Sequence, residues 1–171
     1  MTWKQAILYI FIGIFILALI ATQSGQTDGK ILSYTSTDDT VCLAKNIYWE
    51  ARNESTAGRL AVAWTVINRV RSERFPDSIC GVVEQGIKYA NGFPKRDKCQ
   101  FSWYCDGLPD IVTNISVWRN AYRLAEYVSV GRDHLVDITD GSLWYHADYV
   151  HPRWAKHKKR TAKIDTHIFY R

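Results

Sequence analysis

The chain has 171 residues, of which 47% are hydrophobic, and it carries a formal net charge of +5 at pH 7. That hydrophobic content excludes a disordered chain, and the length left after an apolar N-terminal segment suits one domain with a single core. No pattern of a nucleic-acid-binding module accompanies the positive charge, so an anionic envelope or membrane surface is its better partner. Much of the charge lies in one acid-free stretch, which an ordinary solvated surface would also explain. Its cations are Arg153, Lys156, Lys158, Lys159, Arg160 and Lys163.

An uncharged apolar run, AILYIFIGIFILALIA, occupies residues 6–21 and follows Lys4. The polar residues after it bring the uncharged length to that of a membrane-spanning helix, and no A-x-A cleavage triplet follows. We therefore expect residues 1–24 to be an uncleaved signal anchor rather than a cleaved signal peptide, with a polar tether over 25–37. The positively charged N-terminal end, which carries Lys4, is expected to stay in the cytoplasm. Residues 38–171 are therefore expected on the periplasmic side of the inner (cytoplasmic) membrane.

The first half of the domain is expected to be helical. An aspartate N-cap predicts a helix over 38–52, and a break at 53–55 separates it from a second helix over 56–70 with apolar residues at helical spacing. A serine then opens a short helix over 78–85.

The second half is less regular. Residues 88–109 have no helical period and contain Gly, Pro and Asn, which predicts loops with a short hairpin. The longest helix is expected over 110–130, and two strand-like runs at 142–146 and 166–170 flank the basic stretch. The prediction is a single, monomeric α+β domain that is mainly α-helical, with a small β or loop part.

Four cysteines occur in the chain: Cys42, Cys80, Cys99 and Cys105. An even number behind an export signal predicts two disulfides in an oxidising compartment, with three possible pairings. A zinc site is the competing interpretation, but the sequence has no CxxC pair or familiar finger spacing. No metal and no cofactor are therefore expected.

Glu50 is the candidate acid. It lies in the segment Tyr48-Trp49-Glu50-Ala51, near the end of a helix that otherwise faces a core. Partial burial disfavours the charged form of a carboxyl and raises its pKa, which a proton donor at neutral pH requires. The alternative is an exposed helical glutamate paired with a neighbour. Glu54, four residues on, is expected to support the site by capping or stabilising the next helix.

Several segments of the chain resemble the cell-wall hydrolase family that includes the spore-cortex-lytic enzymes of sporulating bacteria. They follow one another in order across almost the whole domain. The matching segments are CLAKNIYWEARNE (42–54), AGRLAVAWTVINRV (57–70), FPDSICGVVEQG (75–86), CQFSWYCDG (99–107), WYHADYVHPRWAK (144–156) and IDTHIFYR (164–171).

The resemblance implies a lysozyme-like, lytic-transglycosylase-type fold that acts on the glycan strands of peptidoglycan. It places the essential glutamate at Glu50. The family's QFS element falls on Gln100, Phe101 and Ser102 beside the cleft, and its YHA element falls on Tyr145, His146 and Ala147. The chain departs from the family at Asn53, where Gly is usual, and at Arg59, where Gln is common.

One convincing carboxyl suits a lytic transglycosylase, which cleaves between N-acetylmuramic acid and N-acetylglucosamine with a single acid. Glu50 would donate the proton and later take one back. Gln100, Ser102 and Tyr145 would hold the sugar by hydrogen bonds, together with His146, and Trp103 would stack on it. The role would be that of a phage endolysin of the signal-anchor type or of a wall-remodelling enzyme.

Two other functions remain open at this stage. An N-acetylmuramoyl-L-alanine amidase would use zinc, and the chain has enough imidazoles, though without H-E-x-x-H spacing. They are His134, His146, His151, His157 and His167. A non-enzymatic, anchored wall-binding module would grip glycan through its aromatic residues without cutting it.

Overall fold

The computed structural model describes residues 37–171. The predicted signal anchor over 1–24 lies outside these residues, as does nearly all of the predicted tether. None of the helices in the described part is long and apolar enough to cross a membrane.

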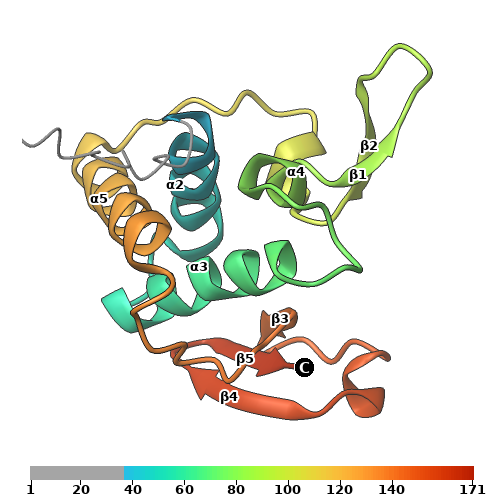
Figure 1. Ribbon diagram of the computed structural model, residues 1–171. Coiled ribbons are helices and arrows are strands. Elements are labelled where there is room, and N and C mark those ends of the chain that lie inside the picture. Colours follow the sequence, from blue (N-terminus) through green and yellow to red (C-terminus); the bar gives the residue numbers. More distant parts are fainter. Residues whose placement is uncertain (1–36) are drawn as a thin grey trace, which may run out of the picture. The chain divides into compact units, whose positions relative to one another are not determined.

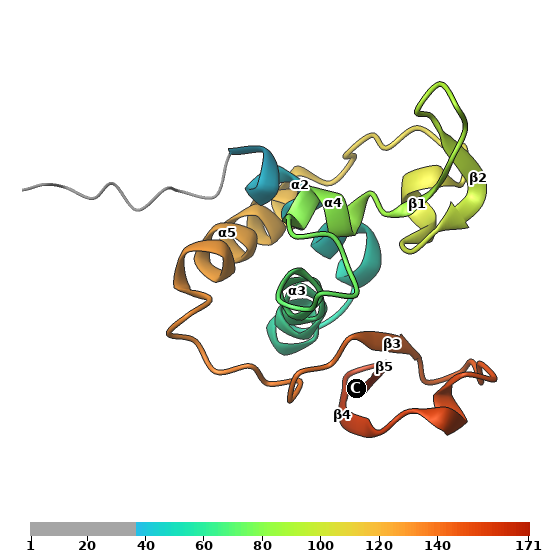
Figure 2. The same cartoon turned by 45° about the vertical axis from the view of Figure 1, so that its right-hand side comes forward.

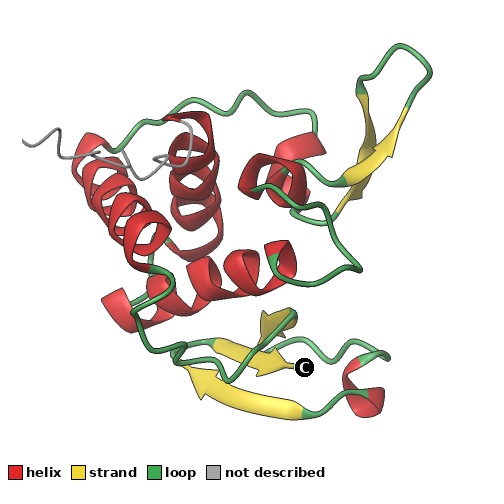
Figure 3. Cartoon of the chain, viewed as in Figure 1, coloured by secondary structure: helices red, strands yellow, loops and turns green. Residues whose placement is uncertain are grey.

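Four α-helices account for most of the regular secondary structure of the described residues (Figures 1 and 3). Side-chain caps mark where three of them start. The helices are α2 (Thr37–Ala51), α3 (Thr56–Val70), α4 (Ile79–Val83) and α5 (Ile115–Gly131). Ser55 accepts a hydrogen bond from the backbone of Gly58 at 3.3 Å and caps α3, and Ser78 caps α4 in the same way. Asn114 caps α5 through the backbone N–H of Val117 at 3.1 Å. Such caps satisfy backbone donors that have no partner inside the helix.

The core forms where α2 packs against the other three helices. Full burial of a large apolar side chain contributes about 1.5–3 kcal/mol, so this cluster supplies most of the domain's stability. The largest fully buried apolar residues of the helices are Leu43, Ile47 and Tyr48 of α2, Val62, Trp64, Val66 and Ile67 of α3, Ile79, Val82 and Val83 of α4, and Val128 of α5.

Two small antiparallel sheets complete the domain. Strands β1 (Gly86–Lys88) and β2 (Pro94–Cys99) form a hairpin that projects away from the helices (Figures 1 and 2). Strands β3 (Trp144–Ala147), β4 (Arg160–Ile164) and β5 (His167–Tyr170) form a sheet in the order β3-β5-β4, which lies beside α3. Tyr145 pairs with Phe169 in this sheet.

The predicted elements are present, with three differences. The last helix begins at Ile115 rather than at 110, and its buried face is made by Ala121, Ala125 and Val128, while Ile111 remains 64% exposed. Helix α2 begins at Thr37, so both aspartates lie in its first turn instead of capping it. The basic stretch contains β4, an edge strand that the sequence did not predict.

Both predicted disulfides form, and the helix packing selects one of the three pairings. Cys42 of α2 bonds to Cys80 of α4. Cys99, at the end of β2, bonds to Cys105 of the 3-10 helix η1 (Ser102–Cys105). The first bond therefore fastens the helix that carries Glu50 to its neighbour, and the second fastens the hairpin to the segment that carries Ser102.

Candidate active site

Glu50 lies in the last turn of α2 and is half-buried. The hydroxyl of Tyr145 on β3 donates a hydrogen bond to its Oε2 atom at 3.0 Å. Burial raises the pKa of Glu50, and this effect outweighs the opposing hydrogen bond from Tyr145 and the positive charge of Arg69. The carboxyl therefore keeps its proton to a higher pH than an ordinary glutamate does, as a general acid needs.

Tyr145 is held in place by the rings around it. Its ring packs edge-on against His167 with centroids 5.2 Å apart, and against Phe169 at 5.6 Å. Burial raises the pKa of Tyr145 well above its ordinary value, and the charge of Glu50 adds to this. The phenol is therefore a permanent hydrogen-bond donor toward Glu50.

Arg69 of α3 is the third member of the site, and it was not predicted from the sequence. It is 4% exposed, and its Nε atom donates to the backbone oxygen of Leu143 at 2.8 Å. The guanidinium lies between the rings of Phe75 and Phe101, with centroid distances of 5.2 and 5.1 Å. Burial lowers the pKa of Arg69 and the charges of Tyr145 and Glu50 raise it, which places this cation in the field of both groups. A cation within a helix whose other residues are mostly buried and apolar was the available signal.

The QFS segment reaches the site through its middle residue. Phe101 is buried against Arg69, while Gln100 and Ser102 on either side of it are exposed. Both polar side chains are therefore open to a ligand, on either side of the ring that packs against Arg69.

Trp103 packs against α2. The residue is only 8% exposed, its ring stacks on that of Trp49, and its Nε1 atom donates to Asn46 at 3.1 Å. This burial leaves little of Trp103 for a sugar, and its predicted stacking role stays a prediction. Trp103 belongs to the core and anchors η1 to α2.

His146 lies on the face of β3 opposite to that of Tyr145, because successive side chains of a strand point to opposite faces. Its predicted contact with the sugar stays a prediction. The His146 ring stacks on Tyr170, and its Nε2 atom lies 2.9 Å from the Tyr170 hydroxyl. It lines a separate hollow of about 420 Å³ together with His151 and Lys156.

The Cell Wall Hydrolase family model matches residues 53–170, which is more than half of the chain. The chain belongs to this family. The predicted membership is thereby confirmed, although the match begins three residues after Glu50.

Among curated proteins, the hydrolase is similar to spore cortex-lytic enzymes. It is 27% identical to one from Bacillus cereus over 135 residues, which cover 78% of this chain and 44% of that protein. It is 37% identical to one from Halalkalibacterium halodurans over 54 residues, covering 32% of this chain and 16% of that protein. The chain thus spans less than half the length of the curated relatives it matches.

Two solved structures share its fold. The catalytic domain of the germination-specific lytic transglycosylase SleB from Bacillus anthracis has a TM-score of 0.57 and 26% identity, covering 80% of this chain and 96% of that one. The catalytic domain of the Bacillus cereus SleB protein has the same TM-score and identity, covering 86% and 99%. These structures confirm the predicted α+β, mostly helical fold of the hydrolase.

Of the two supporting roles expected for Glu54, the structure assigns the capping of the next helix to Ser55. The Glu54 carboxylate instead accepts hydrogen bonds from the hydroxyl of Thr166 at 2.6 Å and from its backbone N–H at 3.2 Å. Next to it, Asp165 accepts from the backbone of Ser55 at 2.8 Å. Together these contacts join the start of α3 to the turn between β4 and β5.

The two departures from the family pattern have structural explanations in the hydrolase. Arg59 donates to the backbone oxygens of Ala51 at 3.3 Å and of Arg52 at 2.8 Å, so it satisfies carbonyls at the end of the helix that carries Glu50. Asn53 is not among the described residues with positive φ. The turn therefore needs no glycine at this position.

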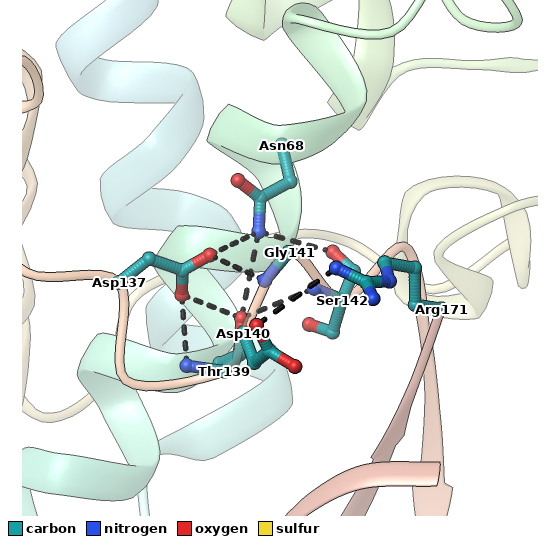
Figure 4. A network of polar contacts seen from close by, with 7 residues as sticks. All are labelled: Asn68, Asp137, Thr139, Asp140, Gly141, Ser142 and Arg171. Carbon is teal, nitrogen blue, oxygen red and sulfur yellow. Dashed lines mark hydrogen bonds and ion pairs between the residues drawn. The ribbon is translucent and has the colours of Figure 1, made fainter. Parts of the chain in front are cut away.

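A second junction holds the entrance to β3 against the end of α3 (Figure 4). Asn68 donates to the carboxylate of Asp137 and to the backbone oxygen of Ser142, at 2.8 and 3.2 Å. Burial alone would raise the pKa of Asp137, but hydrogen bonds from Thr139, Asn68 and the backbone of Gly141 together lower it. This ionised carboxylate organises the loop that leads to Tyr145.

The five histidines do not form a metal centre with other ligands. Within residues 37–171, no three His, Cys, Asp or Glu residues gather closely enough to hold a metal ion.

Proposed function

We propose that the hydrolase degrades peptidoglycan by cleaving its glycan strands between N-acetylmuramic acid and N-acetylglucosamine, through lytic transglycosylation with Glu50 as the only acid and base. The observation that carries the proposal is a half-buried carboxyl with a raised pKa, held by a phenol that stays protonated. The likeness to a SleB catalytic domain described as a lytic transglycosylase supports the same reaction.

In the first step, Glu50 donates its proton to the glycosidic oxygen and the bond from that oxygen to C1 breaks. The substrate's acetamido oxygen supports the positive charge that develops at C1. Tyr145 and Arg69 then stabilise the carboxylate that Glu50 has become, because both favour its ionised form.

In the second step, ionised Glu50 takes the proton of the C6 hydroxyl of the muramic acid. The C6 oxygen bonds to C1 and displaces the acetamido group, which leaves a 1,6-anhydro end. Glu50 is protonated again and no water is consumed. Glu50 must therefore first lose and then regain a proton. Burial favours its protonated form, while Tyr145 and Arg69 favour its ionised form.

Mass spectrometry of the fragments that the full chain releases from purified peptidoglycan tests the proposal. Anhydromuramic ends are expected from the wild type and from Glu126→Gln, a change at an exposed glutamate of α5, and not from Glu50→Gln. Reducing muramic ends would mean hydrolysis by water instead. Free stem peptides would favour the amidase, and binding without any release would favour a wall-binding module.

We also propose that the hydrolase works outside the cytoplasm, held by residues 1–24 in the inner membrane. The two disulfides of the described domain support an oxidising compartment. A C-terminal alkaline phosphatase fusion should be active only when residues 1–24 are present. Activity from the truncated fusion, or recovery of the full chain in the soluble fraction, would contradict this proposal.

A further inference from the structure

The β1–β2 hairpin ends in an ordered tip. The backbone N–H of Tyr89 donates to the Phe93 oxygen at 2.8 Å, and that of Gly92 donates to the Tyr89 oxygen at 2.9 Å. Gly92 adopts a φ of +84°, a conformation that favours glycine. The side chain of Asn91 closes the turn by accepting from the backbone of Phe93 at 3.2 Å. The tip is therefore a hydrogen-bonded turn with a defined backbone conformation.

Apolar rings and cations share the surface of this hairpin. Tyr89 is 55% exposed, Phe93 68% and Ile87 55%, so folding buries little of their apolar area. An exposed group of large apolar side chains on a projecting element is typical of an interaction site. The cations of residues 86–99 are Lys88, Lys95, Arg96 and Lys98, against the single carboxylate of Asp97.

One of these cations lies beside a ring of the hairpin. The Lys95 ammonium lies 5.2 Å from the centroid of the Tyr89 ring. Arg96 and Asp97 are 3.9 Å apart with both side chains 74% exposed, so solvent weakens their attraction. The hairpin thus offers flat apolar rings together with an excess of positive charge.

The base of the hairpin is fixed to the segment beside Glu50. The Cys99–Cys105 disulfide joins β2 to η1, and the backbone of Gln100 donates to the Gln85 oxygen at 2.8 Å. At Gly86, a Cβ atom would lie 2.8 Å from the sulfur of Cys99, so the two strands are in close contact there. Gln100 and Ser102 follow directly, and the hairpin is a rigid extension of the segment that carries them.

We propose that the β1–β2 hairpin is a second binding site for peptidoglycan, which takes sugar rings on Tyr89 and Phe93 and carboxylates of the stem peptides on the neighbouring cations. Flat rings cover the apolar faces of sugars, and ammonium or guanidinium groups bind carboxylates by charge-assisted hydrogen bonds. Peptidoglycan offers both groups along one strand. This inference rests on the proposed function, and it adds a contact remote from the reacting bond.

Sedimentation with purified sacculi tests the inference, with the full chain in a Glu50→Gln background so that the substrate stays intact. Tyr89→Ser/Phe93→Ser and Lys95→Gln/Lys98→Gln should each weaken binding at least fivefold, and the second pair should also reduce its salt dependence. The matched control is Tyr127→Ser/Arg123→Gln, which changes an exposed tyrosine and an exposed cation on α5. It should bind like the parent, and melting curves must show that every variant is folded.

Kinetics in the active background separate this site from the catalytic one. The hairpin variants should raise KM for sacculi while kcat and the anhydro ends stay unchanged, and short soluble glycan fragments should be cut at the parent's rate. Unchanged binding to sacculi, or an equal loss in the control, would refute the inference. The inference would also be refuted if the hairpin variants lost binding to anionic lipid vesicles in a flotation assay but bound sacculi like the parent. If the parent releases no anhydro ends but its binding still depends on the hairpin, the proposed function fails and the inference stands.

Discussion

Replacing Tyr145 by phenylalanine removes the one hydrogen bond that the Glu50 carboxylate accepts within residues 37–171 and little else. The ring keeps its contacts with His167 and Phe169, so the packing of the sheet is preserved. Because the phenol donates at 3.0 Å, it stabilises the ionised form of Glu50. Without it the pKa of Glu50 rises further, since burial remains and only the attraction to Arg69 opposes it.

The magnitude follows from the kind of bond that is lost. A hydrogen bond to a charged group contributes about 1.5–3 kcal/mol. One factor of ten corresponds to about 1.4 kcal/mol, so the ratio of protonated to ionised Glu50 rises at least about tenfold at a given pH. At an alkaline pH where the wild type keeps about a tenth of its maximal activity, Tyr145→Phe should keep about half or more, because Glu50 must be protonated to act as the acid.

The measurement is kcat/KM for release of fragments from peptidoglycan between acidic and alkaline pH. The alkaline limb of the profile should move to higher pH in Tyr145→Phe. Tyr170→Phe is the matched control, because it removes a hydroxyl that contacts His146 on the same sheet. An unmoved limb in Tyr145→Phe, or an equal shift in Tyr170→Phe, would show that this phenol does not set the protonation of the acid.

Three further predictions concern stability. Burial raises the pKa of Glu50, so its ionised form destabilises the fold as the pH rises. Glu50→Gln removes this charge and should make the hydrolase more stable in urea at pH 7 but not near pH 4. No gain at pH 7 would contradict the burial argument. Cys42→Ala/Cys80→Ala should cost about 4 kcal/mol and Cys99→Ala/Cys105→Ala about 2, because the bonds close loops of 38 and 6 residues; thermal melts showing the reverse order would disprove the loop argument. Asp137→Asn should destabilise by about 1–3 kcal/mol at pH 7, through lost hydrogen bonds to a charged group. Because the pKa of Asp137 is lowered, this contribution is lost progressively as the pH falls below the pKa of an ordinary aspartate. The difference between the urea midpoints of wild type and variant should therefore shrink with falling pH, and a constant difference would count against the argument.

The sequence predicts the helices of this domain well, because their signals are local. Ser55, Ser78 and Asn114 each stand directly before an apolar periodic run, and each is the observed cap. The last helix begins at Ile115, five residues later than its apolar pattern predicts. This start depends on the contact of the Asn114 backbone with the Tyr48 hydroxyl at 3.2 Å, which joins residues 66 positions apart.

The site is predictable only in part, because its residues meet across long separations. The apolar neighbours of Glu50 correctly indicated burial, and the YHA pattern indicated Tyr145. A motif gives no direction to a side chain, whereas strand alternation places His146 on the face opposite to Tyr145 and the Asn46 contact holds Trp103 against α2. The apolar helix around Arg69 indicates that this cation is buried, but it does not identify Glu50 and Tyr145 as the groups in its field.

The sheet that carries Tyr145 is attached to α3 at both ends, by Glu54 and Asp165 at the start of the helix and by Asn68 and Arg69 near its end. Glu50 and its hydrogen-bond donor Tyr145 lie on different layers, and separating these layers would break one of these attachments together with buried packing. Activity should therefore be an all-or-none property of each molecule. The fraction of enzyme still working during heating would then follow the fraction still folded, without an earlier phase of loosened but intact protein.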